Sequence, residues 1–284
     1  MVYTRVLKTL GLLPLWVRLP PQVHSKIKLY HFMGALCTKN INKDFFKKWS
    51  SNMAYILGYT VADGCIGVSK NRKNPYSFNI TSIDRPHLYK MRNAMGSNHK
   101  ISNKSGKRVG TPCYEFQTRN PIICQDLIKL GIVPRKTYNL KSMKIPKKYL
   151  SDFSRGFFDG DGSVYIYKVN EVPQIKASFV CISYAFLNNF NYNLCQSLNI
   201  PEKSLQKTKP KGKESYFCQY HITLYISDCE KLFKFMYGNS PELYLTRKYN
   251  IFKKWKTMNL KRRHYVKKNY PSKIGWHLNE KLIK

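Results

Sequence analysis

Two short segments of this chain resemble one another, and each ends in an aspartate followed by a glycine. One runs from Ala54 to Gly64 and the other from Asp152 to Gly162, and their terminal aspartates, Asp63 and Asp161, lie 98 residues apart. At the same offset the small residues of the two segments also coincide: Gly58 with Gly156, Ala62 with Gly160, and Gly64 with Gly162. A repeat of this length indicates a duplicated domain, and a duplicated acid suggests a shared two-metal site on a pseudo-twofold axis.

The signals that follow the two segments recur in the same order. After the first helical segment the pattern predicts strands at 65–68, 76–80, 100–103 and 113–117, and helices at 82–95 and 121–130. After the second it predicts strands at 163–168, 175–183, 204–208 and 216–225, and helices at 184–198 and 227–237. Each half therefore reads αββαββα, which indicates an α+β protein built from two similar half-domains.

The resulting domain organisation has four parts. We expect a basic N-terminal extension at 1–43, half-domains at 44–148 and 149–256, and a basic C-terminal tail at 257–284. The extension contains no acidic residue, and the linker between the halves is basic and contains proline.

The charge balance points to a polyanionic partner. The chain carries 50 Lys and Arg against 15 Asp and Glu, a net charge of +35. Self-repulsion of this size works against a compact fold, so a partner that neutralises it is the economical explanation. Nucleic acid is the partner that we expect first, because each backbone phosphate attracts nearby Lys and Arg side chains. An anionic membrane surface is the second explanation of the charge. The apolar run at 10–17 is interrupted by Pro14 and is too short to span a bilayer, and we expect no membrane partner.

Cysteine usage bears on the compartment. None of the eight cysteines forms a C-x-x-C pair, so zinc-ribbon and thioredoxin-like sites are unsupported. With no clear secretory signal, we expect reduced thiols and a protein of the cytoplasm or an organellar matrix that is not secreted.

The small residues of the repeat predict how its two helices meet. Gly58 and Ala62 are four residues apart, as are Gly156 and Gly160, so each pair shares one helix face. Such faces allow two helix backbones to approach closely and to bring the aspartates at their C-terminal ends side by side. Two adjacent carboxylates are hard to keep ionised without a cation. Oxygen ligands with no His or Cys nearby favour Mg²⁺ over zinc.

Both segments resemble the LAGLIDADG motif of homing endonucleases, in the monomeric form that carries two motifs. The nine-residue cores are Ile56–Gly64 and Ser154–Gly162. The first copy departs from the pattern at the sixth position, where Val61 replaces the usual acid, whereas Asp159 fills that position in the second copy.

The resemblance implies roles for residues of the motifs. Asp63 and Asp161 match the catalytic, metal-binding carboxylates, and we include the adjoining Gly64 and Gly162 in the expected Mg²⁺ site, with Mn²⁺ as a substitute. The helix-packing positions are those of the small residues: Gly58, Ala62, Gly156 and Gly160. Arg119 is the candidate for a basic residue beside a scissile phosphate, and the second half offers no counterpart.

The resemblance also implies a DNA-binding saddle. Each half would contribute an antiparallel, saddle-shaped sheet that lies over the major groove, and both strands would be cut to leave short 3′ overhangs. Expected phosphate contacts are Arg72, Lys73, Arg108, Lys168, Lys176, Lys209, Lys211 and Lys213. Expected base readers are Gln117, Gln174 and Gln219.

An Arg-Lys pair closes each half, Arg135-Lys136 and Arg247-Lys248. Two interpretations stay open for these pairs. They complement the C-terminal dipoles of the preceding helices, or they bind phosphate.

Three functions are compatible with these observations. The leading hypothesis is an intron-encoded or free-standing, site-specific endonuclease that acts as a monomer on double-stranded DNA with a long recognition site. The alternatives are a maturase that binds its host intron RNA and a non-catalytic DNA-binding regulator on the same fold. Retention of both Asp63 and Asp161 favours the nuclease, because neither alternative needs them.

Overall fold

The computed structural model describes residues 39–104, 112–209 and 218–269. The chain divides into two units, Met1–Asn40 and Ile41–Lys284, and the fold presented below belongs to the second. The expected extension at 1–43 lies almost wholly outside the described residues. None of the described helices combines the length and the apolar character that crossing a membrane requires.

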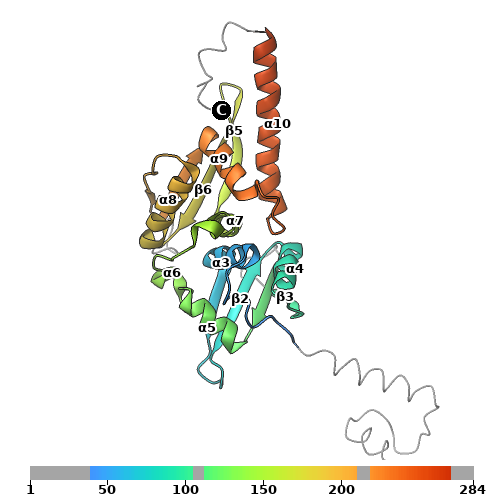
Figure 1. The fold of residues 1–284 in the computed structure, drawn as a ribbon, viewed down its shortest axis with the longest axis vertical. Helices are drawn as coiled ribbons and strands as arrows, with labels where there is room; N and C mark the ends of the chain where they lie inside the picture. Colours follow the sequence, from blue (N-terminus) through green and yellow to red (C-terminus); the bar gives the residue numbers. More distant parts are fainter. Residues whose placement is uncertain (1–38, 105–111, 210–217, 270–284) are drawn as a thin grey trace, which may run out of the picture. The chain divides into compact units, whose positions relative to one another are not determined.

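The first half begins with the first motif helix and builds one four-stranded sheet (Figure 1). Its elements are α3 (Ser51–Asp63), β1 (Gly64–Val68), β2 (Tyr76–Ser82), α4 (Arg85–Ala94), β3 (Ile101–Lys104), β4 (Cys113–Thr118), α5 (Pro121–Lys129) and the short α6 (Lys136–Asn139). All strand pairs are antiparallel, in the order β1-β2-β4-β3.

The second half repeats this arrangement. After a 3₁₀ turn, η1 (Lys147–Tyr149), come α7 (Leu150–Asp161), β5 (Ser163–Val169), β6 (Val172–Cys181), α8 (Tyr184–Leu198), β7 (Gln206–Thr208), β8 (Gln219–Tyr225), α9 (Ile226–Tyr237) and α10 (Thr246–Asn269). The strand order β5-β6-β8-β7 is that of the first sheet. The predicted αββαββα order and the α+β class are confirmed in both halves.

The long helix α10 was not predicted. α10 runs from Thr246 to Asn269, so residues 257–269, assigned to a tail from their charge, continue a helix. Its first turns are fixed to the second half by Phe252 and Trp255, which are buried, and the helix contacts β5 and β6. The abundance of lysine and arginine conceals this spacing, because the sequence as a whole shows little apolar periodicity there.

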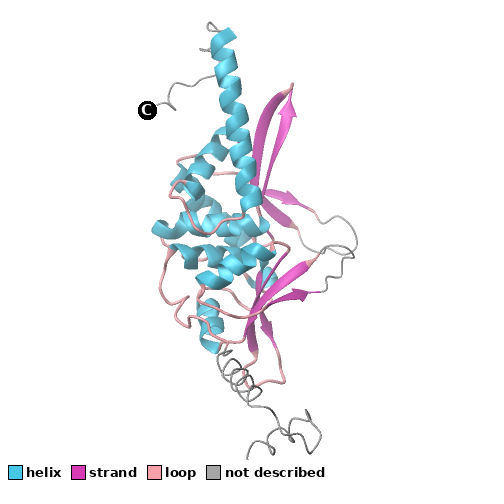
Figure 2. Cartoon of the chain, turned by 90° about the vertical axis from the view of Figure 1, so that its right-hand side faces the viewer, coloured by secondary structure: helices cyan, strands magenta, loops and turns pink. Residues whose placement is uncertain are grey.

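Helices cover one face of both sheets and leave the other face open (Figure 2). The strand register separates the two faces. Towards the helices lie the rows Gly64–Ile80–Phe116–Ile101 and Val164–Ala177–Leu224. On the open faces lie the rows Cys65–Asn79–Gln117 and Tyr165–Lys176–Tyr225.

Candidate functional site

The site is built on the contact between α3 and α7. A Cβ atom added to Gly58 would overlap the Phe153 carbonyl oxygen, and one added to Gly156 would overlap the Tyr55 carbonyl oxygen. These two contacts are reciprocal, because Tyr55 and Phe153 are related by the same 98-residue offset as the two glycines. A reciprocal contact is the mark of a twofold relation. The two motif helices therefore pack backbone to backbone about a pseudo-twofold axis.

The small residues continue this contact to the C-terminal ends of the helices. A Cβ atom added to Gly160 would overlap the Ala62 side chain and would lie 3.6 Å from Asp63 Oδ2. The Asp63 carboxylate therefore lies beside the residue that precedes Asp161. Each helix ends at its aspartate, and the following glycine is extended: Gly64 is the first residue of β1, and Gly162 directly precedes β5.

The two carboxylates influence one another. Both side chains remain open to solvent, although protein atoms surround them on most sides. Desolvation by those atoms, together with the charge of Asp63, raises the pKa of Asp161 to about 6. Desolvation also raises the pKa of Asp63, against the lowering effect of Lys248 and Lys136. A divalent cation between the two carboxylates would remove this electrostatic cost.

A buried lysine caps the C-terminal end of each motif helix. The Lys136 ammonium donates to the carbonyl oxygens of Val61 (2.5 Å) and Ala62 (2.7 Å) on α3. The Lys248 ammonium donates to four carbonyl oxygens at the end of α7, those of Phe158 (2.6 Å), Asp159 (2.8 Å), Gly160 (3.3 Å) and Gly162 (2.5 Å). The last carbonyls of a helix have no partner within the helix, so these ammonium groups satisfy them and complement the helix dipoles.

The Arg-Lys pairs had two interpretations, complementing helix dipoles or binding phosphate, and the contacts of the two lysines agree in part with the first. Both lysines complement helix C-termini, but the helices are the motif helices and not those that precede the pairs in sequence. Burial lowers the pKa of Lys136, and lowers the pKa of Lys248 to about 8, while the Asp63 and Asp161 carboxylates counteract this in both cases. Each ammonium thus lies within electrostatic range of both aspartates.

Arg119 lies elsewhere in the first half. In the register, Gly64 pairs with Ile80 and Ile80 with Phe116, and Arg119 follows three residues after Phe116. That separation is about 10 Å along the strand. The Arg119 backbone carbonyl accepts from the Asn74 side chain at the β1–β2 hairpin. Lys136 is a basic residue that the fold of the first half brings to the Asp63 end of α3. The role expected of Arg119 beside a scissile phosphate stays a prediction.

The register places several expected DNA contacts on the open faces of the sheets. Gln117 lies there on β4, in the row of Cys65 and Asn79, and its side chain is exposed. Gln174 and Lys176 alternate with the buried residues of β6 and lie on the open face of the second sheet. Exposed side chains at the strand ends and hairpins are those of Arg72, Lys73, Lys209 and Gln219.

Other expected contacts do not share this position. Lys168 has the strand parity of the helix-facing Val164 and Ile166, and its ammonium pairs with Glu171 at 2.7 Å in the exposed β5–β6 hairpin. Arg108, Lys211 and Lys213 lie outside the described residues.

Sequence reasoning missed the aromatic side chains of the open face. Tyr165 and Tyr225 are exposed there on either side of Lys176, and the Lys176 ammonium lies 5.7 Å from the centre of the Tyr225 ring. Only strand register shows that these residues share one row, and register is not visible in a sequence.

The donor set suits a hard divalent cation. Within the described ranges there is no cluster of three or more His, Cys, Asp or Glu side chains that could hold a metal. What the site offers is two carboxylates, Asp63 and Asp161, and the carbonyl oxygens of the residues beside them. Such an oxygen-only set fits Mg²⁺, which keeps several waters and binds through one or two carboxylates.

Comparison with known proteins adds to this picture at the level of the fold. No protein-family model and no curated protein matches the sequence. The structure is similar to that of the LAGLIDADG meganuclease I-AabMI bound to uncleaved DNA, with a TM-score of 0.50 and 16% sequence identity over 76% of this chain and 92% of that chain. It is also similar to the LAGLIDADG homing endonuclease I-GzeII in complex with its DNA target, with a TM-score of 0.51 and 11% identity over 77% of this chain and 93% of that chain. The chain therefore has the LAGLIDADG homing endonuclease fold.

Proposed function

We propose that this protein is a site-specific endonuclease that hydrolyses both strands of a double-stranded DNA target and depends on Mg²⁺ or Mn²⁺. The observation that carries the proposal is the pair Asp63 and Asp161, which the close contact of α3 and α7 brings together at two helix ends. The similarity to two proteins whose structures contain DNA supports the choice of substrate.

The motif residues would hold the cation. Asp63 and Asp161 are its ligands in this proposal, with the carbonyl oxygens of Gly64 and Gly162 as further candidates. The Gly162 carbonyl already accepts from Lys248, so only its second lone pair is open to a metal. When bound, the cation neutralises phosphate charge and makes water a stronger nucleophile.

The rest of the chain would bind and orient the target. Lys136 and Lys248 hold the backbone of the helix ends and so fix the directions of the two carboxylates. The open sheet faces present hydrogen-bonding and cationic side chains, among them Gln117, Gln174 and Lys176, which can contact base edges and phosphates. The proposal includes action as a monomer, short 3′ overhangs, an intron-encoded origin and a location in the cytoplasm or an organellar matrix.

The test is cleavage of a target selected from a randomised DNA library by the purified protein. We expect cleavage with Mg²⁺ or Mn²⁺ and none with a chelator. Asp63→Asn and Asp161→Asn should each lower the cleavage rate by about 10³-fold or more, because each removes a charge that the cation needs, and should largely preserve DNA binding.

Asp44→Asn is the matched control. Asp44 is an exposed acid outside both motifs that pairs with Lys47, and its amide variant should cleave at the unchanged rate. Full cleavage by the double variant of Asp63 and Asp161 would contradict the metal assignment. A wild-type protein that cleaves no DNA but binds its intron RNA tightly would favour the maturase.

A further inference from the structure

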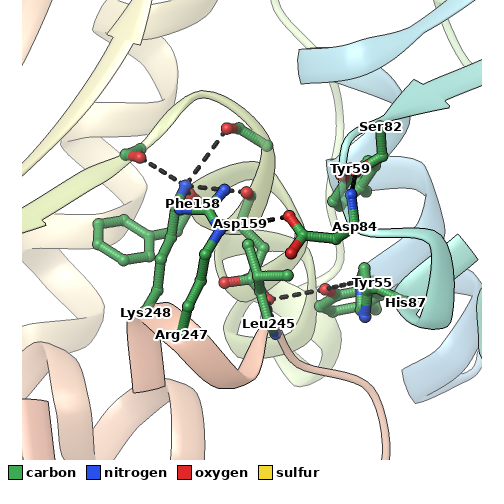
Figure 3. Close-up of polar contacts among 12 residues, drawn as sticks. Tyr55, Tyr59, Ser82, Asp84, His87, Phe158, Asp159, Leu245, Arg247 and Lys248 are labelled. Carbon is green, nitrogen blue, oxygen red and sulfur yellow. Dashed lines mark hydrogen bonds and ion pairs between the residues drawn. The ribbon is translucent and has the colours of Figure 1, made fainter. Parts of the chain in front are cut away.

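The two motifs differ at one buried position. Asp159 occupies the sixth position of the second motif, where Val61 stands in the first. Asp159 is almost completely buried, and its Oδ2 accepts two hydrogen bonds of 2.7 Å, from the Tyr55 hydroxyl and from the Leu245 backbone N–H (Figure 3). A single carboxylate oxygen thus joins α7 to α3 and to the segment that leads into α10.

The first of these bonds reaches into the other half of the molecule. Tyr55 is buried on α3, and its hydroxyl oxygen lies 2.8 Å from His87 Nε2 on α4 (Figure 3). The second bond acts together with Arg155, one turn earlier on α7. The Arg155 guanidinium donates to the carbonyl oxygens of Leu243 (2.8 Å) and Met236 (2.7 Å). Two α7 side chains therefore hold the chain immediately before α10.

The anchoring of the chain before α10 by Asp159 and Arg155 also affects the C-terminal end of α7. The Leu245 carbonyl accepts from the N–H groups of Lys248 and Tyr249, each at 3.1 Å, so Leu245 starts the first turn of α10. Lys248 projects from that turn, and its ammonium binds the carbonyl oxygens of Gly160 and Gly162. Those two residues flank Asp161. The backbone of Asp161 is therefore held on both sides.

The first half lacks this arrangement. Val61 carries no acceptor where Asp159 carries one. Within the described part of the chain, the Lys136 ammonium reaches the carbonyls of Val61 and Ala62, both of which precede Asp63. The backbone on both sides of Asp161 is thus held from α10, whereas the described bonds of Lys136 hold only the backbone that precedes Asp63.

We propose that Asp159 is a positioning residue for the Asp161 half of the active site, and that the two DNA strands are consequently cut by half-sites with unequal support. This inference rests on the proposed endonuclease function. Asp159 acts through the start of α10 and Lys248, and it does not touch the DNA or the cation.

The test compares Asp159→Val with Asp159→Asn. Valine reproduces the residue of the first motif and removes both hydrogen bonds. Asparagine keeps one side-chain oxygen, which can accept from Tyr55 and Leu245 as Oδ2 does. Cleavage of a target labelled on each strand would be followed over time. We expect Asp159→Val to slow one strand at least about tenfold more than the other, so that nicked DNA accumulates, and Asp159→Asn to restore the wild-type ratio.

Asn191→Leu is the control for a lost buried hydrogen bond. Asn191 is buried on α8 of the same half, and its side-chain amide donates to the Lys203 carbonyl at 2.7 Å. This variant should leave the ratio of the two strand-cleavage rates unchanged. Equal slowing of both strands by Asp159→Val, or an Asp159→Asn variant as defective as the valine, would overturn the proposal.

A second measurement does not need cleavage. Hydrogen exchange of the backbone amides at 245–252 should be at least about tenfold faster in Asp159→Val than in wild type and in Asp159→Asn. Unchanged exchange in the valine variant overturns the anchoring role of Asp159, whatever the activity. A wild-type protein that cuts no DNA contradicts the proposed function instead, and the exchange result then decides on the anchor alone.

Discussion

Burial shifts the pKa values of two residues of this protein in opposite directions. Burial lowers the pKa of His87 to about 4, whereas burial raises the pKa of Asp159 to about 6. The two groups are joined through the hydroxyl of Tyr55. At neutral pH this network therefore contains a neutral imidazole and an ionised carboxylate. On acidification His87 takes up its proton first in the unfolded chain, whereas Asp159 takes up its proton first in the folded protein.

The first prediction concerns His87. An unfolded chain binds a proton at His87 near pH 6.5, but the folded protein resists this down to about pH 4. The unfolded state therefore holds more protons in this window, and the free energy of unfolding should fall as the pH falls through it. We expect the His87 contribution to lower the stability by about 2 kcal/mol between pH 7 and pH 5.

His87→Gln isolates that contribution. Asp159 acts in the opposite direction over part of the same window, so the wild type alone does not report on His87. The difference between wild type and His87→Gln, from urea unfolding at both pH values, removes the shared terms. An equal pH dependence in the two proteins would show that His87 is not buried as a neutral group.

At the scale of elements, the contact of α3 with α7 determines the site, because it sets where the two helices end. This contact has room for backbone and for nothing larger at Gly58 and Gly156. α10 is the second element that matters, since it carries Lys248 to the end of α7. Each element is thus placed by one type of interaction, close packing in the first case and hydrogen bonds to carbonyl groups in the second.

The second prediction concerns Gly58→Ala. Alanine favours a helix over glycine by about 1 kcal/mol, but its Cβ would overlap the Phe153 carbonyl oxygen, which is backbone and cannot rotate away. We expect a net loss of about 3 kcal/mol in the free energy of unfolding, measured with urea.

Gly67→Ala serves as the matched control. The nearest atom to its added Cβ is Ser77 Oγ at 2.8 Å, the end of a side chain that can turn aside. Its stability should change by less than about 1 kcal/mol. If Gly58→Ala is as stable as this control, the helices do not pack at backbone distance.

At the scale of the whole molecule, charge is the dominant property. The net charge of +35 is spread over the chain, and most of the described salt bridges include at least one exposed side chain. Ion pairs with exposed partners contribute little to stability, so the excess positive charge is better explained by binding of a polyanion. The proposed DNA partner would be bound with release of many counterions.

The third prediction follows from that release. If six to ten phosphates are neutralised, the affinity for a DNA duplex should fall by about 10³-fold or more between 50 and 200 mM salt. Fluorescence anisotropy of a labelled duplex without Mg²⁺ measures this directly.

Lys176→Ala, on the open face of the second sheet, should reduce the slope of log affinity against log salt by about one. Lys47→Ala, in the exposed pair with Asp44, should leave the slope unchanged, and an affinity independent of salt would contradict a phosphate-dominated interface.

Local patterns were sufficient for much of the fold. Ser50 caps α3 through its side chain, the last glycine of each motif follows the last helical residue, and alternating apolar residues mark the strands. Each of these features depends on neighbours in sequence. The repeated order of elements and the small residues at i and i+4 also predicted that two helices would pack closely. These signals are readable because they arise from residues within a few positions of one another.

The repeated patterns of the sequence are enough to predict the two halves, their order of elements and the two aspartates. That Lys136 and Lys248 lie near these aspartates is visible only in the fold, because the lysines reach the helix ends from segments 73 and 87 residues beyond the aspartates. The partners of Asp159 also come from distant segments, α3 and the chain before α10. Interactions over such separations depend on how elements pack and on strand register, and neither is encoded in a local pattern.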